Sequence, residues 1–160
     1  MVSQKISLGP SKYEKPLFEL ATQVIKKIGA MKKPVILFCG PISTGGFGNV
    51  NENIDYLSSV IQTTEKAGIS VFNQIDHERK MDLILKGHSG YDYPLLEFFY
   101  KPILESGKIE ALLFLPLWET SVGSKWEHDF AKSISIPVFY LDGLFMAEIK
   151  SVYEKMRLPH

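Results

Sequence analysis

The sequence predicts one α/β domain over residues 1–160: a small, doubly wound, mainly parallel sheet of four to five strands with helices on both faces, of the Rossmann or flavodoxin-like kind. Short apolar runs alternate with longer segments of helical spacing, and this alternation is typical of βαβ units. Two apolar runs are followed by polar loops rich in Gly and Ser, at 40–49 and 118–124. Ligands bind beyond the carboxyl ends of the strands in such sheets, so the loops also predict the binding site.

The composition fits one soluble globular domain. Of the 160 residues, 45% are hydrophobic and 22% are charged, which is ordinary for this class. The formal net charge is zero, so no overall charge favours a nucleic acid polymer as a partner. The single cysteine, Cys39, excludes an internal disulfide framework and suits a reducing compartment. No apolar run approaches the roughly 20 residues that a bilayer requires, and the start of the chain lacks a secretory signal. We expect a cytoplasmic protein without membrane contact.

The first half of the chain contains two expected helices and two expected strands. Apolar residues recur at helical spacing over about 14–29, with lysines on or beside the opposite face, which predicts an amphipathic helix. The wholly apolar run 35–39 is typical of a strand that is covered on both faces of a parallel sheet. A helix is expected from near Asn51 to a C-cap at 67–68. The apolar segment 69–72 then predicts the second strand.

The second half continues the alternation after an interruption. Residues 73–94 are polar and poorly periodic, which indicates an inserted loop containing a short helix. A helix is expected over 95–104, although Pro102 should kink or break it. The remaining expected elements are a strand at 111–116, a helix at 125–133, a strand at 137–141 and a tail helix at 144–156.

The loop at 40–49 has the composition of a ligand-binding turn. Its glycines, beginning with Gly40, allow backbone N–H groups to approach a ligand, and Ser43 and Thr44 add hydroxyl donors. The helix that follows points its positive end at the same place. The alternative is that the glycines serve only to turn the chain. Neither a P-loop nor a dinucleotide fingerprint fits, because the Gly-Lys-Ser/Thr ending and the required glycine spacing are missing.

The second loop leads into a helix that carries a carboxylate. Ser121, Gly123 and Ser124 offer hydroxyl and N–H groups that could cradle an anion at the start of the helix. Glu127 is expected just inside that helix, leaning toward the strand ends. The alternative is a capping box between Ser124 and Glu127, which the spacing alone favours. Trp126 is expected either to wall a sugar or base pocket or to belong to the core.

Other motifs do not predict a site. The four histidines, at 77, 88, 128 and 160, show no paired metal-ligand spacing, and one cysteine cannot build a thiolate zinc site. Residues 87–90 are similar to a nucleophile elbow, but the second glycine comes one residue early and no clear strand precedes it. We therefore expect no metal and no cofactor.

Together, the two loops resemble the nucleoside 2-deoxyribosyltransferase superfamily. Its signature is an aromatic-x-Gly-Pro/Ser-Ile loop after the first strand, matched by 38–42, and a Gly-x-x-x-Glu followed by Ala in a later helix, matched by 123–127 and Ala131. The Ser-x-Gly-x-x-x-Glu spacing is most similar to the 2′-deoxynucleoside 5′-phosphate N-hydrolases. The lead-in 115–118 resembles the uncharacterised, often phage-borne branch. The resemblance covers about residues 35–141.

The resemblance implies cleavage or transfer of the N-glycosidic bond of a nucleoside or its 5′-monophosphate. Glu127 would attack the anomeric carbon, which fits a reaction that passes through an oxocarbenium-like state. It also implies a homodimer, because relatives complete their sites across subunits. The implied contacts are Ser121 and the Gly123 region with the 5′ end or its phosphate, and Gly40, Pro41 and Ile42 with the sugar and base.

The sequence departs from the family's pattern at three places. An aspartate expected near 100–102 is absent, Glu110 stands where an Asp usually opens the third strand, and Phe38 replaces a frequent Tyr. A second acid should protonate the leaving base. The candidates for it are Asp92, Glu97 and Glu105. The inserted segment is expected to supply a lid or base-recognition elements, with Asp76, His77 and Asp92.

Two other functions compete with this hypothesis. The first is a non-catalytic nucleotide-binding module that kept the cradle and lost the acid. The second is a lysine-decarboxylase-like phosphoribohydrolase, whose first loop also follows a Phe-Cys-Gly strand. Its Pro-Gly-Gly-x-Gly-Thr-x-x-Glu motif is missing from this chain, which disfavours it.

Overall fold

The sheet has the predicted doubly wound architecture. The computed structural model describes residues 12–142 and 145–157. Four parallel strands, β1 (Val35–Cys39), β2 (Ser70–Val71), β3 (Ala111–Phe114) and β4 (Val138–Tyr140), form one sheet in the order β2-β1-β3-β4. This is a Rossmann/flavodoxin-like α/β fold, and the predicted fold class is confirmed. The chain leaves β1 toward one edge and returns to β3 on the other side, so the strand order reverses between β1 and β3.

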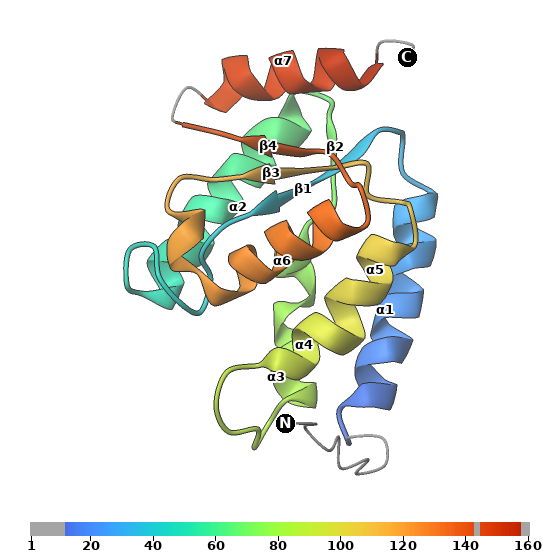
Figure 1. Cartoon of the computed structure of the whole chain (residues 1–160), viewed down its shortest axis with the longest axis vertical. Coiled ribbons are helices and arrows are strands. Elements are labelled where there is room, and N and C mark those ends of the chain that lie inside the picture. The colour runs from blue at the N-terminus through green and yellow to red at the C-terminus, as the bar shows by residue number, and fades with distance from the viewer. Residues whose placement is uncertain (1–11, 143–144, 158–160) are drawn as a thin grey trace, which may run out of the picture.

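The sheet is covered on both faces, which is why its strands read as continuous apolar runs. Every residue of β1 and β3 is buried. Successive side chains alternate between faces: Leu37 and Cys39 belong to one buried cluster, whereas Ile36 and Phe38 belong to the other. Figure 1 shows helix α7 across the sheet from α6, α5 and α1.

The helices divide between these two clusters. The cluster that contains Cys39 includes residues of α1 (Glu14–Gly29), α3 (Glu78–Ile84), α5 (Lys101–Glu105) and α6 (Val122–Ser133). The other includes residues of α2 (Val50–Lys66) and α7 (Phe145–Arg157). Shorter helical turns are η1 (Gln74–His77), α4 (Tyr93–Leu95), η2 (Leu96–Tyr100) and η3 (Trp118–Thr120). The predicted first helix and the strand at 35–39 are confirmed to the residue. The expected start of the tail helix at 144 and the first residues of the chain lie outside the described part.

The segment 73–94 is more ordered than the predicted loop. Its first half is helical throughout, as η1 and α3, and Met81 is only 1% exposed. Gln74 and His77 are also buried. This helical segment could not be predicted from hydrophobic periodicity, because half of its inward-facing residues are polar.

The predicted helix at 95–104 is present, and its expected irregularity takes an unusual form. Helical structure runs from Tyr93 to Glu105, with a π-helical stretch, η2, just before Pro102. The Lys101 N–H donates to the Leu96 carbonyl, five residues back. Because proline lacks an N–H and its ring crowds the preceding turn, the chain widens there instead of breaking.

Candidate functional site

The two predicted loops meet at the carboxyl ends of β1 and β3 and are bonded to each other. The Gly46 N–H donates to Thr120 Oγ1 at 2.8 Å, and the Val122 N–H donates to Thr44 Oγ1 at 3.0 Å. A Cβ on Gly45 would lie 2.2 Å from the Thr120 carbonyl oxygen. The glycine is therefore required for the close approach of the two loops, as well as for its positive φ of 67°.

Asn53, in the first turn of α2, fixes the first loop from within. Its Nδ2 donates to the carbonyls of Ile42 and Gly45 at 3.0 and 3.2 Å, and its Oδ1 accepts from the Phe47 N–H at 3.0 Å. Asn53 is 3% exposed, so these bonds replace water for three backbone groups. The loop is thus rigidly attached to the start of α2.

Helix α6 begins earlier than predicted, which excludes the capping box. Ser121 is its N-cap, and the Ser121 hydroxyl accepts from the Ser124 N–H at 3.2 Å. Ser124 is already the third helical residue and cannot cap the same helix, and Glu127 lies in the second turn. The capping-box alternative was wrong because the earlier serine takes the cap, which leaves the Glu127 carboxylate for another partner.

That partner is the thiol of Cys39, the last residue of β1. Cys39 Sγ donates to Glu127 Oε2 at 3.3 Å. Glu127 is 8% exposed, and burial raises its pKa to about 7, although the thiol hydrogen bond opposes that rise. Burial also raises the pKa of Cys39, as does the neighbouring carboxylate. The thiol therefore stays protonated and acts as the donor.

A cavity of about 300 Å³ opens beside Glu127 at the switch point between β1 and β3. Most of the predicted site residues line it, from both loops and from the segment before α4. They are Gly40, Ile42, Ser43, Asp92, Ser121, Gly123, Ser124 and Glu127. Val50 and Ile54, from the start of α2, also reach the cavity, as expected for a helix pointing at the site.

Two predicted site residues do not face this cavity. Pro41 lines a separate cavity of about 210 Å³, together with Asn53 and Leu117. Trp126 stacks on Phe130, with ring centroids 5.1 Å apart and planes 7° from parallel. Adjacent helical residues diverge by about 100°, so Trp126 joins the core when Glu127 faces the cavity.

One wall of the cavity was not predicted from the sequence. It is formed by η1, α3 and the turn that follows them. Gln74, Glu78, Met81, Asp82 and Leu85 all line it. Their spacing is helical, so a period search that counted Gln, Glu and Asp as inward-facing would have found them.

Two tyrosines, Tyr91 and Tyr100, also line the cavity. Burial raises the pKa of Tyr91 to about 12, Glu127 adds a smaller contribution, and the Ser43 side chain opposes the rise. Tyr100, where the resemblance leads one to expect an aspartate, is 6% exposed. Burial raises its pKa far above the ordinary value, and the carboxylates of Glu78 and Glu127 raise it further. Tyr100 therefore lies within electrostatic reach of both acids.

The cavity is acidic and contains unsatisfied polar atoms. Four carboxyl side chains line it, and no Lys, Arg or His is among the lining residues. Gln74 Nε2 donates to the Phe38 carbonyl at 2.8 Å. Within the described ranges, Gln74 Oε1 and the Ser124 hydroxyl are buried without a hydrogen-bond partner. Buried polar atoms without partners are uncommon, and both belong to residues that line the cavity.

The other acids considered from the sequence lie elsewhere or are engaged. Asp92 lines the cavity but is 43% exposed and pairs with His88 at 3.4 Å. Glu97 is 52% exposed and lies 4.0 Å from Lys101, while Glu105 is exposed on α5. Glu110 Oε2 accepts from the Val35 N–H at 2.7 Å, at the amino end of the sheet. That position supports the start of β1 and is remote from the cavity.

The two speculative contributors from the inserted segment are also outside the cavity. Asp76 is exposed. His77 packs between Phe72 and Phe99, with ring centroids 5.9 and 6.3 Å away. Burial lowers its pKa, as do Lys27 and Lys80. His77 is therefore a core residue in its neutral form.

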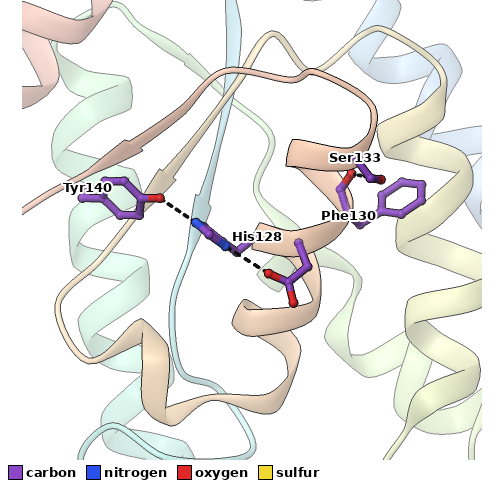
Figure 2. Close-up of polar contacts among 5 residues, drawn as sticks. His128, Phe130, Ser133 and Tyr140 are labelled. Carbon is purple, nitrogen blue, oxygen red and sulfur yellow. Dashed lines mark hydrogen bonds and ion pairs between the residues drawn. The ribbon is translucent and has the colours of Figure 1, made fainter.

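A second polar cluster connects α6 to β4 (Figure 2). His128 Nε2 contacts the Tyr140 hydroxyl at 2.5 Å, and His128 Nδ1 lies 3.3 Å from an oxygen of Asp129. Trp118 stacks on the His128 ring at 4.6 Å. The start of the predicted 118–124 loop thus packs toward β4, whereas Ser121, Gly123 and Ser124 line the cavity.

Comparisons of the chain with protein-family models, curated proteins and solved structures found no match. No group of three or more His, Cys, Asp or Glu side chains within residues 12–142 and 145–157 could hold a metal ion. Among the helices of the described chain, none is long and apolar enough to cross a membrane.

Proposed function

We propose that this protein cleaves or transfers the N-glycosidic bond of 2′-deoxynucleosides, with Glu127 as the nucleophile. The observation that carries the proposal is a buried carboxyl group, held by one oxygen, at the wall of the switch-point cavity. The Cys39 thiol engages Oε2, which leaves Oε1 for a ligand. The resemblance of both loops to the deoxyribosyltransferase superfamily supports the same residue for the same role.

The environment of Glu127 suits attack on an anomeric carbon. Glycosidic cleavage develops positive charge on the sugar, and a carboxylate stabilises or captures it. A carboxylate out of contact with water interacts more strongly with that charge than a solvated one does. Because its pKa is about 7, about half of the molecules carry the ionised form at neutral pH.

The charge of the cavity favours a nucleoside over its 5′-monophosphate. A phosphate would bring two negative charges toward four carboxyl side chains, with no cationic side chain on the lining to offset them. An uncharged 5′-hydroxyl avoids that repulsion. It could accept from the Gly123 N–H, near the positive end of α6, and donate to the Ser124 hydroxyl, which has no other partner in the described chain.

Gln74 gives the cavity a preference for the base. Its Nε2 must face the Phe38 carbonyl, because a carbonyl can only accept, and this fixes Oε1 as the remaining group. Oε1 is an acceptor, so it pairs with an N–H donor of the ligand. The exocyclic amino groups of cytosine and adenine are such donors.

The test is to incubate the protein with each deoxynucleoside and each 5′-monophosphate and to separate free base by chromatography. Base release from deoxycytidine or deoxyadenosine is expected, together with an intermediate one deoxyribosyl group heavier in the intact mass. Glu127→Gln should abolish both signals, whereas the exposed Glu119→Gln should keep them. Full activity in Glu127→Gln would contradict the mechanism. Nucleotide binding without base release would favour the non-catalytic module instead.

The homodimer expected from the resemblance stays a prediction. Sedimentation at micromolar concentration measures it directly. A monomer that cleaves nucleosides would show that the cavity is complete within one chain.

A further inference from the structure

The cavity contains a second partly buried acid that the sequence analysis did not select. Glu78 opens α3, on the wall opposite the two loops, and its side chain lines the cavity with Glu127. Burial raises its pKa to about 7, and the neighbouring Asp82 and Asp92 add to the rise. No lysine, arginine or histidine within the described ranges forms an ion pair with it. A carboxyl group without a cation and among like charges tends to keep its proton.

The other proton donors on the lining are less suitable. Asp82 is exposed, and Asp92 is half-exposed and paired with His88. Tyr91 and Tyr100 are weak acids, because burial and the adjacent carboxylates raise the pKa of each. Apart from Glu127, the proposed nucleophile, Glu78 is the one lining carboxyl group that is both partly buried and free of an ion pair with a basic side chain within the described residues.

Glu78 and Glu127 also share a neighbour. Both carboxylates raise the pKa of Tyr100, which lines the cavity with them. They come from separate elements, α3 and α6, and both line the same cavity of about 300 Å³. Gln74 precedes Glu78 by one helical turn on the same run and lines the same cavity. The wall that offers an acceptor to a base therefore also presents an acid.

We propose that Glu78 is a catalytic residue that donates a proton to the leaving base; this inference rests on the glycosidase function proposed above. As a Glu127 oxygen bonds to the anomeric carbon, the N-glycosidic bond breaks and its electron pair goes to the base nitrogen. The Glu78 proton passes to the base, leaving a Glu78 carboxylate. That carboxylate then accepts a proton from a water molecule whose oxygen attacks the anomeric carbon, which releases Glu127 as a carboxylate. With a second base in place of water, the same steps give a transferase.

The two carboxyl groups should produce a narrow pH profile. Attack requires Glu127 ionised, so activity rises through its pKa, and donation requires Glu78 protonated, so activity falls through its pKa. Both values are about 7, so the two carboxyl groups titrate in the same pH range. The expected kcat/KM profile is a bell centred near pH 7.

The test compares Glu78→Gln with the wild type on two substrates. Deoxycytidine has a leaving base that requires a proton, whereas 4-nitrophenyl 2-deoxyriboside has a leaving group that does not. The variant should lose roughly 100-fold or more in kcat/KM on deoxycytidine, but less than about tenfold on the nitrophenyl glycoside. Its remaining activity should also lack the alkaline fall. Glu97→Gln, exposed and outside the cavity, is the matched control and should match the wild type on both substrates.

The outcomes separate this inference from the function on which it rests. An equal loss on both substrates, or an unchanged alkaline fall, assigns Glu78 a structural role and overturns the inference alone. If the wild type is active and Glu78→Gln is equally active, the inference alone is overturned as well. Inactivity of the wild type on both substrates overturns the glycosidase function and the inference together. Circular dichroism of Glu78→Gln excludes unfolding as the cause of a loss.

Discussion

Glu127→Gln should make the protein more stable above pH 7. The wild-type side chain is buried and has a pKa of about 7, raised from 4.5 by burial. Between these two pH values the unfolded chain has lost the proton and the folded chain still holds it. Because the folded state then binds more protons, the free energy of unfolding falls as pH rises through this window. Glutamine stays neutral in both states and is free of this loss.

The size of the effect follows from the pKa shift. One pKa unit corresponds to about 1.36 kcal/mol, so a rise from 4.5 to about 7 gives a pH-dependent difference of about 3 kcal/mol. Glutamine is close in shape to glutamate, and its Oε1 can still accept from the Cys39 thiol. The difference should therefore be absent near pH 4, grow between pH 4.5 and 7, and stay constant above pH 7.

Urea unfolding, followed by the fluorescence of the two tryptophans, measures this difference at several pH values. With a denaturant slope of about 1–3 kcal/mol/M, the variant should gain on the order of 1–3 M in midpoint at pH 8. Glu97→Gln is the matched control, since the Glu97 side chain is 52% exposed and its removal should leave the pH dependence unchanged. Parallel stability curves for the wild type and Glu127→Gln would refute the claim that Glu127 is desolvated.

Three further predictions test the loops and the corrected placements. Gly46→Ala should lower stability well beyond Gly48→Ala in urea unfolding: both have positive φ, but a Cβ at Gly46 would lie 2.5 Å from an Asn53 oxygen, and at Gly48 it meets nothing within 4 Å. Ser121→Ala removes the N-cap of α6 and should cost about 1 kcal/mol of unfolding free energy. Trp126→Phe should leave KM unchanged in a base-release assay, because Trp126 stacks on Phe130; a rise of tenfold or more would show that it contacts the ligand.

The parts of the fold that could be predicted are those in which apolar residues occupy all of the buried positions. β1 and β3 are buried on both faces, so each appears as an unbroken apolar run. The helix α1 buries one stripe of apolar residues, and its spacing shows directly. The position of the two loops then followed, since consecutive βα units bring strand ends to one edge.

The missed wall of the cavity has a physical explanation. Gln74 and Glu78 face inward yet are polar, and they are placed there by Met81 and Leu85 from the same helical run. Hydrophobic periodicity cannot register a polar residue that faces a cavity. The sequence therefore suggests Asp92, Glu97 and Glu105 as the second acid, although Glu97 and Glu105 are exposed.

The start of α6 shows a different limit of sequence reasoning. Ser121 and Ser124 are both possible N-caps for this helix. Local spacing alone favours Ser124, in a capping box with Glu127. The bond from the Val122 N–H to Thr44 Oγ1 fixes the chain before the helix in a way that depends on a residue far away in sequence. Competing caps of this kind are decided by tertiary contacts.

The bonds between the two loops have a consequence for when the cavity forms during folding. The two bonds join residues that are separated by 74 and 78 positions in the sequence. The bond between Cys39 and Glu127 spans 88 positions. Contacts between such distant positions carry a large chain-closure entropy and form late in folding. A nascent chain that contains only α1, β1 and α2 has the first loop but lacks the second loop, to which the first is hydrogen-bonded. The cavity should therefore be complete only after β3 and α6 have docked. If the protein has the proposed activity, its recovery during refolding should report this late event.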